Sequence, residues 1–182
     1  MGQTKQTWAF CLLKSCYRRN LPHLQRENKA HFLTFCTYRR WILPESARDI
    51  VLQTCLRADG WTIELYAVVV MPDHVHMIFV PGLDHVKSEV ISLARITKAI
   101  KGGSAHLIGR RLGRSGRVWQ EESFDRVLRA SEKIEEKVAY ILENPVRQGL
   151  VASSGDYRWL WRKTFKNPYD TETLPSSARL GR

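Results

Sequence analysis

Two histidines lie two positions apart inside an apolar stretch, VVMPDHVHMIFV, at residues 69–80. Such a stretch is typical of a β-strand, in which residues i and i+2 point to the same face. His74 and His76 would therefore project side by side, with Cα atoms about 6.5 Å apart for a strand rise of about 3.3 Å per residue. Two neutral imidazoles at that spacing can bind one divalent ion. The spacing alone leaves open the alternative of two ordinary polar side chains on a solvated sheet face.

A tyrosine and an asparagine form a second group of candidate reactive side chains. Tyr140 and Asn144 lie in ASEKIEEKVAYILENPVRQGL (130–150), where the apolar spacing predicts a helix. Positions i and i+4 share a helix face, so the phenol and the carboxamide would project together. A phenol can be a nucleophile that forms a covalent intermediate, and a metal ion that polarises the electrophile assists it. The alternatives are a half-buried core or interface tyrosine and an asparagine that only ends the helix before Pro145.

The chain is strongly basic, with 29 Lys and Arg against 18 Asp and Glu and a net charge of +11. Such a charge attracts polyanions, of which nucleic acid is the commonest. Residues 95–117 include seven basic residues and no acidic one, a pattern that fits contact with a phosphate backbone, although a solvated face is the usual explanation of a charge run. Trp119 and Phe124 could stack on bases but are expected in the core. The candidate contacts are Arg18, Arg19, Arg26, Arg95, Lys98, Lys101, Arg110, Arg111, Arg114 and Arg117.

The elements that must position these residues follow from hydrophobic periodicity and from turn residues. Strands are predicted at residues 31–40, 61–71, 74–81 and, after a loop, towards the end of 116–128. Helices are predicted at residues 44–60, 88–112 and 130–150. Pro72-Asp73 is a short turn that suggests a hairpin of the second and third strands. Gly102-Gly103 would interrupt the second helix, and Asn144-Pro145 would stop or kink the third.

The order β-α-β-β-α-β-α favours an α+β fold, a ferredoxin-like (RRM-like) antiparallel sheet with helices on one face. We expect a basic N-terminal arm at 1–29, for which a solvated tail is the alternative, a single domain at 30–165, and a disordered tail at 166–182. No run of residues is long and apolar enough to cross a membrane. The four cysteines match no zinc-binding spacing and are expected to be reduced thiols in a cytosolic protein. These are Cys11, Cys16, Cys36 and Cys55.

Two stretches taken together, VVMPDHVHMIFV and YILENPVRQGLV, resemble the REP-associated tyrosine transposases. This group belongs to the single-tyrosine HUH transposases of bacterial insertion sequences. The stretches LPHLQRENKAHFLTFCTYRR, IKGGSAHLIGRRLGRSGRVWQEESFDRVLR and DYRW agree in order and spacing, so that the resemblance runs from about residue 18 to about residue 161. It departs at Asp73, where relatives more often have asparagine, and in the first 17 residues, which do not match.

The resemblance implies a histidine pair on a central strand and a C-terminal catalytic helix. His74 and His76 would bind Mg²⁺ or Mn²⁺, and Asn144 would complete the metal site. Tyr140 would be the nucleophile that cleaves and rejoins DNA strands through a 5′-phosphotyrosine, leaving a free 3′-OH. The implied partners are single-stranded DNA hairpins like those of repetitive extragenic palindromes, with no membrane. The protein would be a monomer or homodimer in the bacterial cytoplasm, associated with the nucleoid.

Two other functions remain open. The first is a non-catalytic nucleic-acid-binding module on a ferredoxin-like sheet, although such modules typically carry aromatic residues where this chain has His74 and His76. The second is a metal phosphohydrolase in which water replaces Tyr140 as the nucleophile. The presence of all four candidate residues, including Asn144, favours the tyrosine enzyme.

Overall fold

The computed structural model describes residues 29–84, 86–129 and 133–164. The predicted arm, with Arg18, Arg19 and Arg26, and the predicted tail from residue 166 lie outside the described residues. The strands are β1 His31–Cys36, β2 Ile63–Val70, β3 His74–Pro81, β4 Leu83–Asp84, β5 Glu89–Val90, β6 Phe124–Val127 and β7 Leu160–Arg162. The helices are α1 Glu45–Ala58, α2 Leu93–Leu112, α3 Ile134–Leu142 and α4 Asn144–Arg147, with 3-10 helices η2 Tyr38–Arg40 and η3 Ser154–Asp156.

One five-stranded sheet, in the order β6-β1-β3-β2-β7, is the centre of the fold. All four strand pairs are antiparallel, so β3 is flanked on both sides. In the pairing of β1 with β3, Thr34 lies opposite His76 and Cys36 lies opposite His74. A shift of one residue would turn every side chain to the other face, so this register determines which residues meet the histidines.

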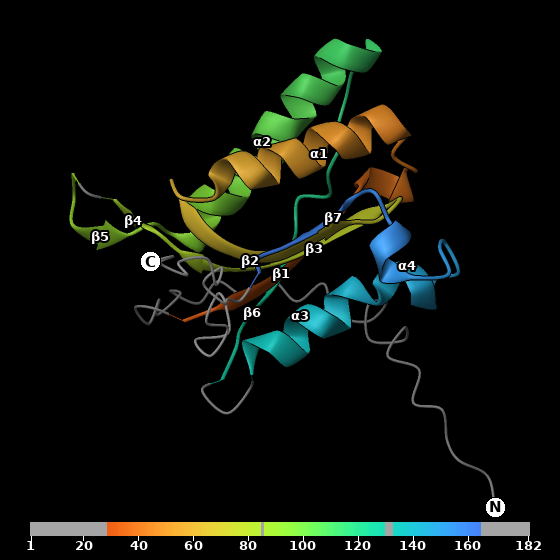
Figure 1. Ribbon diagram of the computed structural model, residues 1–182. Coiled ribbons are helices and arrows are strands. Elements are labelled where there is room, and N and C mark those ends of the chain that lie inside the picture. The colour runs from red at the N-terminus through yellow and green to blue at the C-terminus, as the bar shows by residue number, and fades with distance from the viewer. Residues whose placement is uncertain (1–28, 85, 130–132, 165–182) are drawn as a thin grey trace, which may run out of the picture.

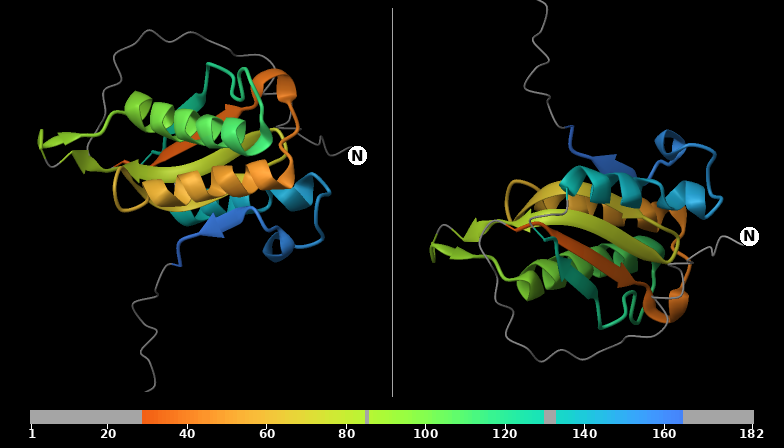
Figure 2. Two further views of the ribbon diagram at one scale, coloured as in Figure 1. Left: turned by 90° about the horizontal axis from the view of Figure 1, so that it is seen from above. Right: turned by 90° about the horizontal axis from the view of Figure 1, so that it is seen from below.

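Helices cover both faces of this sheet (Figures 1 and 2). Helices α1 and α2 lie on one face, and α3 lies on the opposite face, against β2 and β3. The core between the sheet and the helix pair contains Leu33, Phe35 and Val75, each at most 1% exposed. Side chains alternate along a strand, so the residues between these core positions point toward α3. The predicted α+β fold is confirmed, with α3 as a separate layer.

Two predictions of the elements need correction, and three short strands were not predicted. Helix α2 continues through Gly102 and Gly103 without the predicted interruption. Two glycines in a helix cost about 1 kcal/mol each relative to alanine, but buried Ile96 and Ile100 anchor the helix to the core. Strand β1 ends at residue 36, and η2 follows it. The sequence also gave no indication of the β4–β5 hairpin or of the short edge strand β7.

Two cysteines lie in the described part of the chain, and both are free thiols, as predicted. Complete burial raises the pKa of the Cys55 thiol to about 12, so that this side chain is an unreactive part of the core. None of the helices in the described ranges is long and apolar enough to cross a membrane.

Candidate metal and nucleophile site

The two histidines lie side by side at the start of the central strand β3, as the spacing predicts. Their ring centroids are 4.7 Å apart and the ring planes are inclined by 75°. The exposed fractions are only 4% for His74 and 6% for His76. Burial therefore excludes a pair of ordinary polar side chains on a solvated sheet face.

Each histidine uses its Nδ1 atom in a hydrogen bond within the protein. His74 Nδ1 donates to Asp73 Oδ1 at 2.6 Å. His76 Nδ1 lies 2.7 Å from Thr34 Oγ1, a residue of β1. When Nδ1 carries the proton, Nε2 of the same ring presents a lone pair, which is the usual arrangement of a metal-binding histidine.

The surroundings keep both imidazoles neutral at ordinary pH. Burial lowers the pKa of His74, although Asp73 opposes this change. Burial, followed by the neighbouring His74, lowers the pKa of His76 to about 3. Neutral imidazole is the form that binds a metal ion, and imidazole suits Mn²⁺ better than Mg²⁺. The pair therefore fits part of a divalent-ion site.

The histidines do not form a complete metal site by themselves. Among residues 29–84, 86–129 and 133–164, no group of three or more His, Cys, Asp or Glu side chains is placed to hold a metal ion. Within these ranges, the further ligands left to consider are an amide oxygen, water or an oxygen of the substrate. The carboxamide of Asn144 is the predicted candidate.

Tyr140 lies on α3, the helix that covers the histidine face of the sheet. The apolar side of α3 is buried through Val138 and Ile141, whereas Tyr140 is 39% exposed. The guanidinium carbon of Arg147 lies 4.5 Å from the centroid of the Tyr140 ring. Helix α3 runs toward the end of the sheet at which β3 begins (Figure 1). The phenol is thus accessible on the side of the sheet that carries the histidines.

Asn144 begins α4, directly after the break that ends α3, where the sequence predicts a stop or kink. Its Nδ2 atom donates to the main-chain oxygen of Ile141 at 3.2 Å and more weakly to that of Tyr140 at 3.5 Å. Within the described residues, neither Tyr140 nor Asn144 makes a hydrogen bond or ring contact with His74. The structure therefore brings the predicted site residues to one face of the sheet without direct contact between the two groups.

The predicted DNA-contact residues of the run 95–117 lie on the opposite side of the sheet, on α2 and the segment after it. Three of them are held by interactions within the protein. Arg95 pairs with Asp84 at 2.6 Å, Lys101 donates to the main-chain oxygen of Glu121 at 2.9 Å, and Arg114 lies over the ring of Trp41 at 3.9 Å. The exposed members of this run are Arg95, which is paired with Asp84, and Lys98, Arg110, Arg111 and Arg117.

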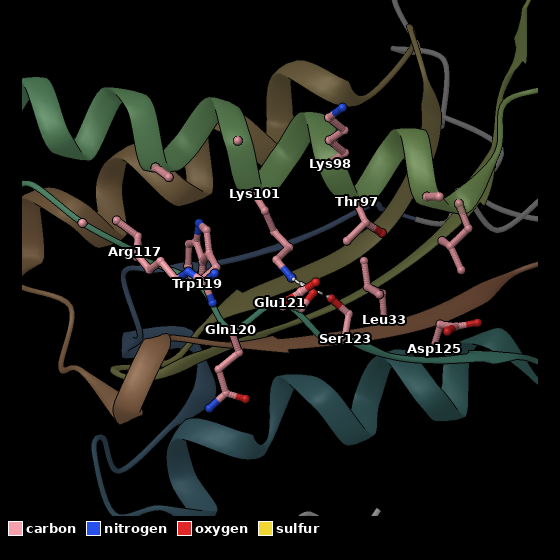
Figure 3. A pocket seen from close by; sticks show the side chains of 16 residues that line it. Leu33, Thr97, Lys98, Lys101, Arg117, Trp119, Gln120, Glu121, Ser123 and Asp125 are labelled. Carbon is pink, nitrogen blue, oxygen red and sulfur yellow. Dashed lines mark hydrogen bonds between the residues drawn. The ribbon is translucent and has the colours of Figure 1, made fainter. Parts of the chain in front are cut away.

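A groove with a volume of about 770 Å³ separates α2 from the segment 116–125 (Figure 3). Lys98, Lys101 and Arg117 line it together with Glu121 and Asp125, so basic groups exceed acidic ones in its lining by one. Trp119 also lines it but is 6% exposed and donates from Nε1 to Ser104 Oγ at 3.0 Å, in agreement with the predicted core position. Phe124 is 53% exposed, so its predicted core position is wrong. Strand β6 is an edge strand, which explains why its first side chain lacks a covering layer.

Several residues around the histidines were not found from the sequence. Asp73 contacts His74, and Arg40 Nε in turn lies 3.1 Å from Asp73 Oδ2. A carboxylate directly before a histidine was the available signal for Asp73. Thr34 and Arg40 carried no local signal, because the pairing of β1 with β3 brings Thr34 to the site and the turn after β1 brings Arg40 there.

Comparisons with known proteins agree with this fold and with the resemblance inferred from the sequence. The family model described as "Transposase IS200 like" matches residues 25–144. A solved structure of a REP-associated tyrosine transposase bound to a REP hairpin is 23% identical, with a TM-score of 0.62, covering 80% of this chain and 81% of that chain.

A provisionally assigned transposase from Deinococcus radiodurans R1 is 21% identical, covering 69% of this chain and 96% of that chain. Its TM-score of 0.41 is too low for a shared fold to be inferred. No curated protein sequence matches this chain. Because the family model spans well over half of the 182 residues, the chain belongs to the family of IS200-like transposases.

Proposed function

We propose that this protein is a metal-dependent single-stranded DNA endonuclease and strand transferase that acts through a 5′-phosphotyrosine on Tyr140. The observation that supports it most strongly is the buried pair His74 and His76, whose Nδ1 atoms are both occupied by protein partners. Tyr140 is accessible on the helix that covers the same face of the sheet. Membership in the transposase family supports the same chemistry.

In this proposal the Nε2 atoms of His74 and His76 would hold Mn²⁺ or Mg²⁺, and the carboxamide oxygen of Asn144 would complete the protein ligands. A divalent ion bound there would neutralise charge that develops on the phosphate oxygens during the reaction. The surrounding sheet and α3 restrict water at the histidines, which are both more than nine-tenths buried.

The Tyr140 hydroxyl oxygen attacks the scissile phosphorus in line with the leaving 3′ oxygen. The phosphorus–oxygen bond to Tyr140 forms as the bond to the 3′ oxygen breaks, and the phenol proton passes overall to that oxygen. One ester replaces another, so a free 3′-OH can later attack the phosphotyrosine and restore a continuous strand without ATP. Cleavage and rejoining are thus the two directions of a single step.

A DNA hairpin is the partner that we propose, because the solved relative with the same fold was bound to a REP hairpin. Exposed Lys98, Arg110, Arg111 and Arg117 would contact its phosphates. Arg95, Lys101 and Arg114 were predicted to do so as well. Because their side chains are engaged in contacts within the protein, we expect them to contribute less to DNA binding. Arg18, Arg19 and Arg26 of the arm remain proposed contacts. Since α2 and the histidines lie on opposite faces, the bound strand would pass around an edge of the sheet.

The test is a covalent protein–DNA adduct, detected as a labelled protein band on a denaturing gel. The protein is incubated with Mn²⁺ and labelled single-stranded hairpins from repeats that flank its gene. Tyr140→Phe and added EDTA should each abolish the adduct. Tyr38→Phe is the matched control, because Tyr38 also lies near a guanidinium, that of Arg39.

Each result discriminates between the functions that the sequence left open. An adduct that needs both Tyr140 and the metal ion supports the proposal. Cleavage without an adduct would show that water is the nucleophile, as in a phosphohydrolase. Hairpin binding without cleavage, over a range of ions and substrates, would identify a non-catalytic module.

A further inference from the structure

The turn that precedes the histidines is held by the segment that follows β1. Thr37 binds the main-chain oxygen of Asp73 twice, through its backbone nitrogen at 2.9 Å and its hydroxyl at 3.0 Å. The backbone nitrogen of Leu43 donates to the oxygen of Pro72 at 2.7 Å. The backbone of the 72–73 turn is thus fixed from one side by residues 37–43.

This segment contains two consecutive arginines in the left-handed backbone region. The φ angles are 53° for Arg39 and 57° for Arg40, values that residues other than glycine rarely adopt. The reversal directs the Arg40 guanidinium back over the start of β3. Its Nε lies 3.1 Å from Asp73 Oδ2, and its Nη1 donates to Cys36 Sγ at 3.2 Å.

Both anchor points of Arg40 are next to the same histidine. Cys36 lies opposite His74 in the pairing of β1 with β3, and Asp73 precedes it in the chain. The two oxygens of the Asp73 carboxylate have separate partners. Oδ2 forms an ion pair with Arg40, and Oδ1 accepts a hydrogen bond from Nδ1 of His74 at 2.6 Å. A continuous chain of contacts therefore runs from Arg40 through Asp73 to the imidazole.

We propose that Asp73, clamped by Arg40, is a positioning residue that holds His74 with its proton on Nδ1 and its Nε2 lone pair toward a divalent ion. The inference rests on the proposed function, in which His74 is a metal ligand. A carboxylate hydrogen bond of this kind fixes the tautomer and the orientation of a ligating histidine. His76 receives the equivalent contact from a neutral hydroxyl, that of Thr34. The two ligands are thus supported by different chemistry.

The first test measures the tautomer of His74 in the protein without metal or DNA. Long-range ¹H–¹⁵N spectra distinguish a protonated Nδ1 from a protonated Nε2. The wild-type spectrum should show His74 with its proton on Nδ1, and Asp73→Ala should give a mixture of both tautomers. Asp73→Asn should restore the wild-type form, because the amide oxygen can still accept from Nδ1. A wild-type tautomer in Asp73→Ala would overturn the inference.

The second test measures Mn²⁺ affinity without DNA, from the electron paramagnetic resonance signal of the free ion. Asp73→Ala should weaken binding about 10-fold or more, as is typical when the hydrogen-bond partner of a ligating histidine is removed. Asp73→Asn should recover most of the loss. Equal affinities of wild type and Asp73→Ala would contradict a positioning role.

A matched pair of substitutions tests the clamp. Arg40→Lys and Arg39→Lys each keep the charge and occupy the same left-handed turn, but only Arg40 contacts Asp73. Lysine lacks the planar fork that reaches both Cys36 and Asp73. Arg40→Lys should therefore weaken Mn²⁺ binding a few-fold, while Arg39→Lys should leave it unchanged. Equal effects of the two substitutions would exclude the clamp.

These measurements separate the inference from the proposed function. If wild-type protein binds no Mn²⁺ but has the Nδ1 tautomer that Asp73→Ala loses, the metal site of the proposed function fails while the role of Asp73 in orienting His74 remains. If wild type binds Mn²⁺ and Asp73→Ala binds it equally well, the metal site stands and the inference fails.

Discussion

The polar residues on the two sides of the central sheet differ in their burial. On the α3 face, His74 and His76 are almost fully buried, and each has a defined hydrogen-bond partner. On the α2 face, Arg110 and Arg111 are exposed at the last turn of the helix. A reaction at one phosphorus atom requires side chains fixed within a fraction of an ångström, whereas attraction to a phosphate backbone does not. The difference supports the proposal that the chemistry takes place on the α3 face and that the α2 face contributes affinity for DNA.

The largest expected effect separates the two faces by activity. His76→Ala should reduce adduct formation at least about 100-fold, because it removes a proposed ligand of the ion that stabilises the transition state. Hairpin affinity, measured by fluorescence anisotropy, should change little. An adduct yield equal to that of wild type would remove His76 from the proposed chemistry.

The reverse pattern is expected on the α2 face. The double substitution Arg110→Glu/Arg111→Glu should weaken hairpin binding about 10- to 100-fold at low salt and make its salt dependence shallower, because each lost phosphate contact reduces the slope by about 1. Adduct formation at saturating DNA should stay near the wild-type rate.

The matched control for this double substitution is Arg57→Glu/Lys87→Glu. It makes the same change in charge at two exposed positions outside the 95–117 run. If the control weakens binding as much as the α2 substitutions do, affinity depends on net charge alone and the α2 face has no special role.

A smaller effect concerns stability and pH on the α3 face. The pKa of His76 is about 3 in the folded protein, against 6.5 for an ordinary histidine. The unfolded chain therefore binds the proton first, so the stability contributed by neutral His76 is complete above pH 6.5 and declines as the pH falls toward 3. The decline between pH 6.5 and 5 should be up to about 2 kcal/mol.

Urea denaturation in EDTA at pH 7 and at pH 5 measures this contribution. His76→Gln should lose less stability over that interval than wild type, because glutamine does not titrate. Identical pH dependence of the two proteins would show that burial does not keep His76 neutral.

The smallest effect distinguishes structural from exposed cations within the basic run. Lys101→Gln should destabilise the fold by about 1 kcal/mol, because its ammonium group binds the main-chain oxygen of Glu121 and the hydroxyl of Ser123. Lys98→Gln, on the same helix but exposed, should leave the melting temperature unchanged. Equal stability of the two variants would show that these contacts of Lys101 do not stabilise the fold.

Local patterns in the sequence were sufficient to predict four of the five strands of the sheet and the paired histidines. Strand β3 was predicted with its observed bounds, 74–81. Both signals are local in the sequence: the period of two within the strand and the Pro72-Asp73 turn directly before it. That the side chains of His74 and His76 point to the same face of the sheet followed from strand geometry alone. The break at Asn144 was also predicted, since proline restricts the residue before it.

Features that depend on distant pairing could not be predicted. Thr34 meets His76 only through the register of β1 with β3, and the placement of α3 on the opposite face from α2 depends on the path of the chain between layers. Helix α2 continues through Gly102 because packing against the core outweighs its low helix propensity. Phe124 has a core-type side chain but lies on an edge strand.

The central claim is that Tyr140 carries the DNA strand during the reaction. The most direct measurement is mass spectrometry of the peptides obtained after the adduct is digested with protease and nuclease. We expect a nucleotide attached to the Tyr140 oxygen in the presence of Mn²⁺ and none in EDTA. A nucleotide on another residue, or cleaved DNA with no modified peptide, would contradict it.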